Sequence, residues 1–130
     1  MEIISISLDS ETLKELNSIQ EKLGYKSRSK MLRSTINALL NEYKALDKIT
    51  GVHEAVFVMT YKERERNHIS AILHEFEKII KVTVHQHHGT LCLDMLNVDA
   101  DAEMIRRLFG ALRRSRCVSS INFALLGSSA

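Results

Sequence analysis

The hydrophobic positions of the first 45 residues predict one strand followed by two helices. In residues 3–8, Ile4, Ile6 and Leu8 alternate with other residues at a spacing of two, which is typical of a half-buried strand. Asp9 or Ser10 then caps a helix that ends at Gly24. Two stripes follow at helical spacing: Leu13, Leu16, Ile19 and Leu23, then Leu32, Ile36, Leu39, Leu40 and Tyr43.

This first segment contains a strand but no second strand to pair with it. A lone strand leaves backbone N–H and C=O groups unsatisfied, and so short a segment buries too little surface to be stable alone. We therefore expect a homodimer in which the strands of two copies pair antiparallel and the four helices pack beneath them.

From residue 47 onward the pattern alternates between strands and helices. We expect strands at 55–61, 79–87, 91–98 and 117–125 and helices at 64–77 and 102–114, with Cys117 as a small core residue of the last strand. The order β-α-β-β-α-β is that of a ferredoxin-like domain. The chain is thus predicted to be α+β, with an N-terminal domain over residues 1–46 and a ferredoxin-like (ACT-like) domain over residues 47–130. Because the chain contains no proline, the linker is either a helix extension or a flexible hinge.

Composition narrows the class of protein only moderately. The mean hydropathy of −0.10 and net charge of +2 describe an ordinary globular chain, and no apolar run approaches the roughly 20 residues that span a bilayer. We see no secretory signal and expect a cytoplasmic protein with free cysteines and no membrane association. No phosphate-binding glycine loop or activated nucleophile is recognisable, so we expect no enzymatic activity.

Local charge and polarity indicate a DNA-binding arm. The outward strand residues Ile3, Ser5 and Ser7 could contact base edges if two strands formed a ribbon in the major groove. The second helix opens at Arg28, Ser29 and Lys30, where free N–H groups and the helix dipole favour a phosphate. Taken alone, Ser5 and Ser7 are more typical of solvent-facing residues on an edge strand, but the whole strand-helix-helix pattern favours binding to double-stranded operator DNA.

Histidines and a cysteine in the second domain indicate a metal site. His85 and His87 lie two apart on a predicted strand and therefore share a face, Cys92 follows a short turn, and a helix upstream carries His74. A set of imidazoles and one thiolate favours nickel, cobalt, copper or zinc over magnesium and calcium. We expect His88, in the turn, to be a bystander or a spare low-affinity ligand. His68 is expected to be solvated, a second metal site being the alternative.

Together these features resemble the nickel-responsive regulators of the ribbon-helix-helix family, over nearly all 130 residues. In those regulators a His-x-His pair and a following Cys come from one subunit, and a His eleven residues before the pair comes from a neighbour. The resemblance implies that His85, His87 and Cys92 bind nickel with His74 of another subunit in a four-coordinate, near-planar site. It also implies a homotetramer formed by the C-terminal domains and DNA binding strengthened by nickel.

Two positions depart from the family pattern. Four residues separate His87 from Cys92, where the family usually has five, so either the hairpin turn is one residue shorter or the register is shifted. Ile3 stands where the family often has a basic residue that bonds guanine, so we expect a different operator.

We therefore predict a metal-responsive, DNA-binding transcriptional regulator that senses nickel and acts as a repressor. One alternative is a ribbon-helix-helix regulator whose ferredoxin-like domain senses a small molecule such as an amino acid. Another is a metal carrier without an operator, which the basic residues at the start of the second helix disfavour.

Overall fold

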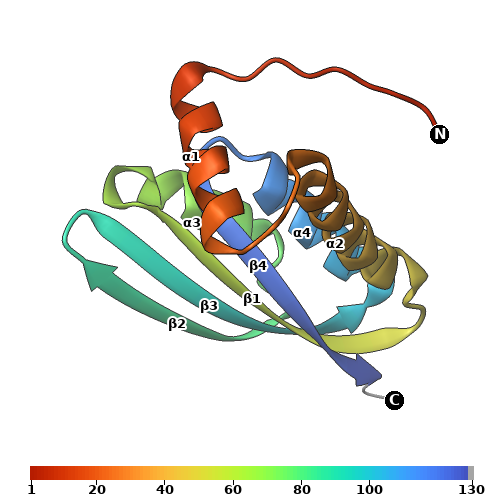
Figure 1. The fold of residues 1–130 in the computed structure, drawn as a ribbon. Helices are drawn as coiled ribbons and strands as arrows, with labels where there is room; N and C mark the ends of the chain where they lie inside the picture. The colour runs from red at the N-terminus through yellow and green to blue at the C-terminus, as the bar shows by residue number, and fades with distance from the viewer. Residues whose placement is uncertain (129–130) are drawn as a thin grey trace. The chain divides into compact units, whose positions relative to one another are not determined.

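The structure is a computed structural model that describes residues 1–128 (Figure 1). The chain divides into two compact units, Met1–Lys44 and a larger one that begins at Ala45. Within residues 1–128, every helix is too short or too polar to cross a membrane.

The first helix of the N-terminal unit, α1 (Ser10–Lys22), is fixed by its two caps. At its start, the Thr12 N–H donates to Asp9 Oδ1 at 2.7 Å. At its end, Gly24 adopts a φ of +74°, and the N–H groups of Gly24 and Tyr25 donate to the carbonyls of Glu21 and Gln20. This is the Schellman motif, which needs a left-handed residue at the position of Gly24. The sequence prediction of Asp9 and Gly24 as the helix boundaries is confirmed.

The second helix, α2 (Arg28–Lys48), begins where the sequence predicts and runs further than expected. Ser27 Oγ accepts the Lys30 N–H at 3.1 Å, which identifies Ser27 as the N-cap. The Arg28 guanidinium donates to Asn17 Oδ1 at 2.9 Å and so joins the start of α2 to α1. Because α2 stays helical to Lys48, the predicted linker begins as an extension of the helix rather than as a hinge.

Residues 1–9 form neither helix nor strand in the single chain, in contrast to the strand predicted at 3–8. Ile3, Ile4, Ile6 and Leu8 are all exposed. The alternation of side chains is a property of the sequence, but a strand also needs a second strand to accept and donate its backbone hydrogen bonds. The prediction assigned that role to a second copy of the chain.

The C-terminal unit has the predicted β-α-β-β-α-β order, and the predicted α+β fold class is confirmed. Its elements are β1 (Val52–Lys62), η1 (Glu63–Glu65), α3 (Arg66–Glu75), β2 (Ile80–His88), β3 (Leu91–Asp101), α4 (Ala102–Arg114) and β4 (Val118–Ser128). The strands lie in the order β2-β3-β1-β4, and every pair is antiparallel. The helix expected at 64–77 is divided into a 3₁₀ turn and a shorter α-helix.

The hydrophobic core lies between one face of this sheet and helices α3 and α4 (Figure 1). Alternate residues of β1 and β3, including Phe57, Met59 and Leu96, meet Ile69 of α3 and Leu108 of α4 there. The helices leave the other face of the sheet open, so Val84 and Met95 are exposed in the single chain. Cys117 lies just before β4, half-buried, and is not a residue of the last strand as predicted.

Candidate functional site

The hairpin of β2 and β3 brings the predicted metal ligands of one chain together. His85 pairs with Asp94 and His87 with Cys92 across the two strands, so these four side chains lie on one face. The pairing is regular from Val82 to Leu91. A two-residue turn at Gly89-Thr90 closes the hairpin, with a φ of +64° at Gly89 only, as in a type II′ turn. The shorter loop between His87 and Cys92 is therefore a tight turn and does not shift the register.

His85, His87 and Cys92 place their donor atoms within 4.8 Å of one another. The Nε2 atoms of His85 and His87 are 3.1 Å apart, and Cys92 Sγ lies 3.6 Å from His87 Nδ1. Nitrogen binds such ions at about 2.0–2.1 Å and sulfur at about 2.3 Å, so two donors sharing one ion lie at most about 4.4 Å apart. The two short distances involve different nitrogens of His87, and only one of them can bind a given ion. The three side chains therefore lie close enough to share one transition-metal ion after the side chains adjust.

Asp94 and Tyr61 hold His85 in place, and sequence reasoning missed both. Asp94 is only 4% exposed and accepts hydrogen bonds from Tyr61 Oη at 2.9 Å and from His85 Nδ1 at 2.5 Å. Burial and the Asp94 carboxylate raise the pKa of Tyr61, so its hydroxyl remains a donor. With Nδ1–H bonded to a carboxylate, His85 Nε2 keeps its lone pair for an ion. The sequence offered one signal for Asp94: it is an acidic residue among apolar residues on the inner face of a predicted strand.

Cys92 is the buried donor of the group. It is 1% exposed, and burial together with the nearby carboxylates of Glu63 and Asp94 raises the pKa of its thiol. An ion that binds Cys92 must therefore displace a proton. A depression of about 560 Å³, lined by His87 and Cys92 among others, gives access to the sulfur.

His74 lies apart from the other three predicted ligands. It is in the last turn of α3 with its side chain 78% exposed, and its Nδ1 lies 3.1 Å from the Glu77 carboxylate. A single chain thus brings three of the four predicted donors to one point, and His74 faces solvent where a second copy could reach it.

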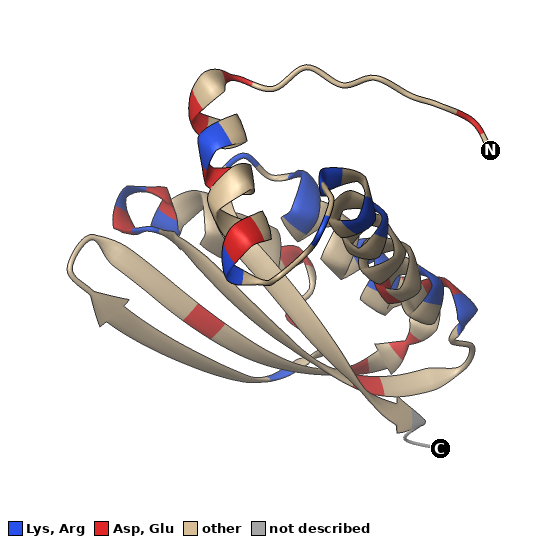
Figure 2. Cartoon of the chain, in the orientation of Figure 1, with Lys and Arg blue, Asp and Glu red and all other residues tan. Residues whose placement is uncertain are grey.

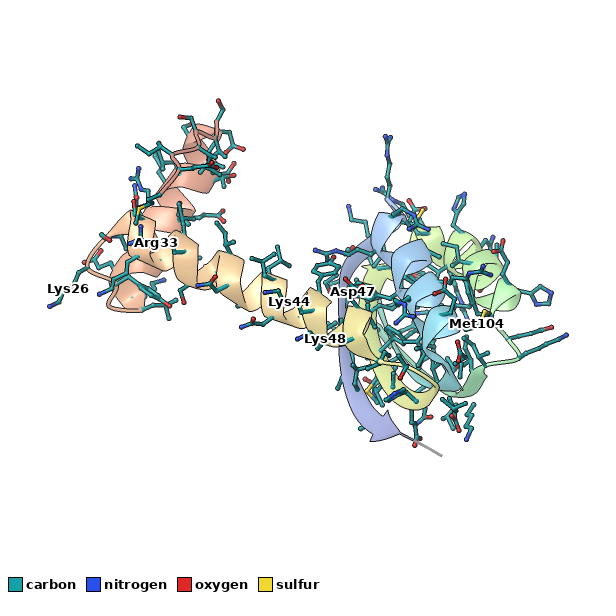
Figure 3. All side chains as sticks on the ribbon, turned by 90° about the vertical axis from the view of Figure 1, so that its right-hand side faces the viewer. Lys26, Arg33, Lys44, Asp47, Lys48 and Met104 are labelled. Carbon is teal, nitrogen blue, oxygen red and sulfur yellow. The ribbon has the colours of Figure 1, made fainter. Side chains whose placement is uncertain are left out.

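The predicted DNA-binding residues fall into two exposed groups. Ile3, Ser5 and Ser7 lie in the extended N-terminal segment, and Arg28, Ser29 and Lys30 form the first turn of α2. Lys26, before the helix, and Arg33, in its second turn, add positive charge at the same end of α2 (Figures 2 and 3). Arg28 is partly committed to Asn17, so Lys30 is the more available of the two cations in the first turn.

Two family models match the chain. Ribbon-helix-helix protein, copG family, matches residues 2–43, and NikR C terminal nickel binding domain matches residues 55–126. The chain belongs to the nickel-responsive regulator family. This family member is 28% identical over 130 residues to a protein of Methanococcus maripaludis, a match that covers 97% of this chain and 92% of that protein. It is 31% identical over 110 residues to one of Methanococcoides burtonii, covering 81% and 78%. Both relatives are provisionally named nickel-responsive regulators.

A solved structure shares the fold of part of this regulator. An uncharacterized protein of Thermotoga maritima aligns with a TM-score of 0.55 at 18% identity, covering 59% of this chain and all of that one. This likeness concerns the fold alone. The two family domains identify the chain as a metal-responsive, DNA-binding regulator rather than an enzyme, as the sequence predicts.

Proposed function

We propose that this regulator senses nickel through His85, His87 and Cys92 of one chain and His74 of another, and that nickel-bound protein represses transcription at a two-fold operator. The observation that carries the proposal is the convergence of two imidazoles and one thiol within 4.8 Å. A buried carboxylate behind His85 supports it further, because ligating histidines commonly donate their second N–H to such a group.

The donor set itself restricts the metal. Imidazole and thiolate suit borderline ions such as nickel, cobalt, copper and zinc, whereas magnesium and calcium require oxygen ligands. The match to a nickel-binding domain favours nickel among these. When bound, nickel would supply a link between the donors of two chains.

The N-terminal unit would bind DNA as a dimer. Ile4, Ile6 and Leu8 are exposed in the single chain, as are Ile36, Leu39 and Leu40 of α2. Pairing with a second copy would cover these apolar side chains and complete the backbone hydrogen bonds of residues 3–8. The ribbon would then present Ile3, Ser5 and Ser7 to base edges, and Arg28, Ser29 and Lys30 to phosphates.

The C-terminal units would join two such dimers into a homotetramer. Met95 on the open face of the sheet is flanked by Val58 and Val84 on the neighbouring strands. Met95 is 40% exposed and Val82, on the same strand as Val84, is 55% exposed. The strands are largely free of charged side chains (Figure 2). Covering the apolar part of this face with a second copy is favourable.

Metal would control DNA binding by selecting among arrangements of the subunits. An ion held by donors of two chains binds best when those chains are correctly placed, so it increases the population of that arrangement. By thermodynamic linkage, an arrangement that binds nickel better and also binds the operator better makes each ligand strengthen the other. We propose that the regulator acts in the cytoplasm.

The deciding experiment measures operator affinity with and without nickel after chelation. We expect nickel to tighten binding by about 5- to 150-fold, which is the usual range of allosteric coupling. His87→Gln and Cys92→Ser should abolish the nickel effect and leave metal-free binding unchanged. His88→Gln is the matched control, because His88 is exposed on the same hairpin outside the cluster.

An operator affinity independent of every metal tested, in protein that still binds DNA, would contradict metal control. The alternative is a ferredoxin-like domain that senses a small molecule such as an amino acid. It predicts that His85→Gln and Cys92→Ser retain the full response to that molecule.

A further inference from the structure

A second group of metal-binding side chains lies elsewhere in the C-terminal unit. Glu65 of η1, His68 in the first turn of α3, and Cys117 just before β4 place one donor atom each within 4.8 Å of one another. This group shares no residue with the cluster of His85, His87 and Cys92. Its sulfur comes from a distant part of the sequence, so the fold rather than local helix geometry brings it to Glu65.

The contacts among the three residues already bring their donors together. Glu65 Oε2 lies 3.2 Å from His68 Nδ1, and the Cys117 sulfur lies within 4.8 Å of a donor atom of each. The interaction between the thiol and the carboxylate lowers the pKa of Glu65 and raises the pKa of Cys117. Arg64 Nε is also near, 3.7 Å from Glu65 Oε1, but its side chain is largely exposed.

A simpler interpretation is a surface ion pair beside a half-buried cysteine. His68 and Glu65 are three residues apart, and such pairs are common at the start of a helix. Two facts go beyond it. A thiol, the scarcest of the donor types in this chain, is the third member of the group. Glu65 and Cys117 are half-buried, whereas His68 is 72% exposed and leaves one side open to water.

We propose that Glu65, His68 and Cys117 form a second metal site, which takes a zinc-like divalent ion in tetrahedral geometry with water as the fourth ligand. Carboxylate oxygen, imidazole nitrogen and thiolate sulfur are all ordinary zinc ligands, and three of them leave one position for solvent. Binding replaces the thiol proton, which goes to solvent, so each ion releases one proton.

The site joins the start of α3 to the start of β4. An ion there would fix the first turn of the helix that carries His74 in its last turn, and would thereby restrict where His74 can reach. This consequence rests on the proposed function, whereas the existence of the site does not.

Cobalt titration of the full chain in a His87→Gln/Cys92→Ser background tests the proposal, because that background lacks donors of the first cluster. We expect about one cobalt ion per chain, with a thiolate-to-cobalt absorption band and the visible bands of a tetrahedral ion, all lost on adding zinc. Cys117→Ser should remove the thiolate band. His68→Gln, at an exposed position, should weaken cobalt binding more than about tenfold.

Glu75→Gln and His88→Gln are matched controls, since both residues are exposed and outside the two groups. They should leave the titration unchanged. Absence of a thiolate band in folded protein, or a band that survives Cys117→Ser, would overturn the second site. Neither outcome bears on nickel binding at His85, His87 and Cys92, because the background lacks that cluster.

Discussion

Asp94 is the residue on which the geometry of the candidate nickel centre depends most. Its carboxylate is buried and accepts hydrogen bonds from both Tyr61 and His85, so it fixes the ring of His85 and its protonated nitrogen. A buried carboxylate without such donors would be costly. We therefore interpret Asp94 as a positioning residue for the metal ligands rather than as a ligand.

Replacing Asp94 with asparagine should weaken nickel binding by about 10- to 100-fold, as is usual when the partner of a ligating histidine is removed. The amide can still accept the Nδ1–H bond, but it lacks the charge that strengthens this bond and stabilises the cation. The affinity is measured by competition with a chelator of known affinity. Tyr61→Phe keeps the carboxylate and should have a smaller effect. Equal losses in both variants, or none, would contradict the positioning role.

At the scale of elements, helix boundaries follow local capping chemistry. Asp9 accepts hydrogen bonds from both the N–H and the hydroxyl of Thr12, and Ser27 plays the corresponding role for α2. Such contacts involve residues three apart, so the sequence alone predicts them. The bounds of α4, Ala102–Arg114, also agree with the sequence prediction, because most of its apolar stripe is buried in the core.

The cap at Asp9 makes the stability of α1 depend on pH. Hydrogen bonds from Thr12 lower the pKa of Asp9 in the folded chain below the ordinary value of 3.8. A lowered folded pKa means that the contribution is present above the ordinary pKa and is lost as the pH falls through the folded value. Asp9→Asn keeps a capping side chain that does not titrate.

We therefore expect the unfolding free energy of the wild type, relative to Asp9→Asn, to decrease as the pH falls below 3.8. Urea denaturation of both proteins over a series of pH values measures this difference, and the other carboxylates cancel in the comparison. A difference that does not change with pH would show that Asp9 caps the helix without gaining from its charge.

For the whole molecule, the exposed apolar surfaces of the single chain favour association with further copies. A dimer would cover the exposed apolar residues of the N-terminal segment and α2, and a second contact would cover the open face of the β-sheet. Met95 is central on this face, between Val58 and Val84. Burial of such a face stabilises an assembly by roughly 25 cal/mol for each Å² of apolar surface covered.

Met95→Lys should therefore reduce the proposed tetramer to dimers, which analytical ultracentrifugation measures directly. Met95→Leu keeps the apolar surface and is the matched control. A tetramer that persists in folded Met95→Lys protein would show that another surface joins the dimers.

Residues close together in the sequence are enough to predict the order of the elements, their caps, and the sharing of one face by His85 and His87. These follow from periodicity and from hydrogen bonds between residues a few positions apart. Contacts between residues far apart in the sequence are known only from the folded chain. Strand pairing placed Asp94 behind His85 and Cys92 opposite His87, and packing brought Cys117 to Glu65 and His68. Such contacts depend on register and on the path of the chain between segments, which no local pattern encodes.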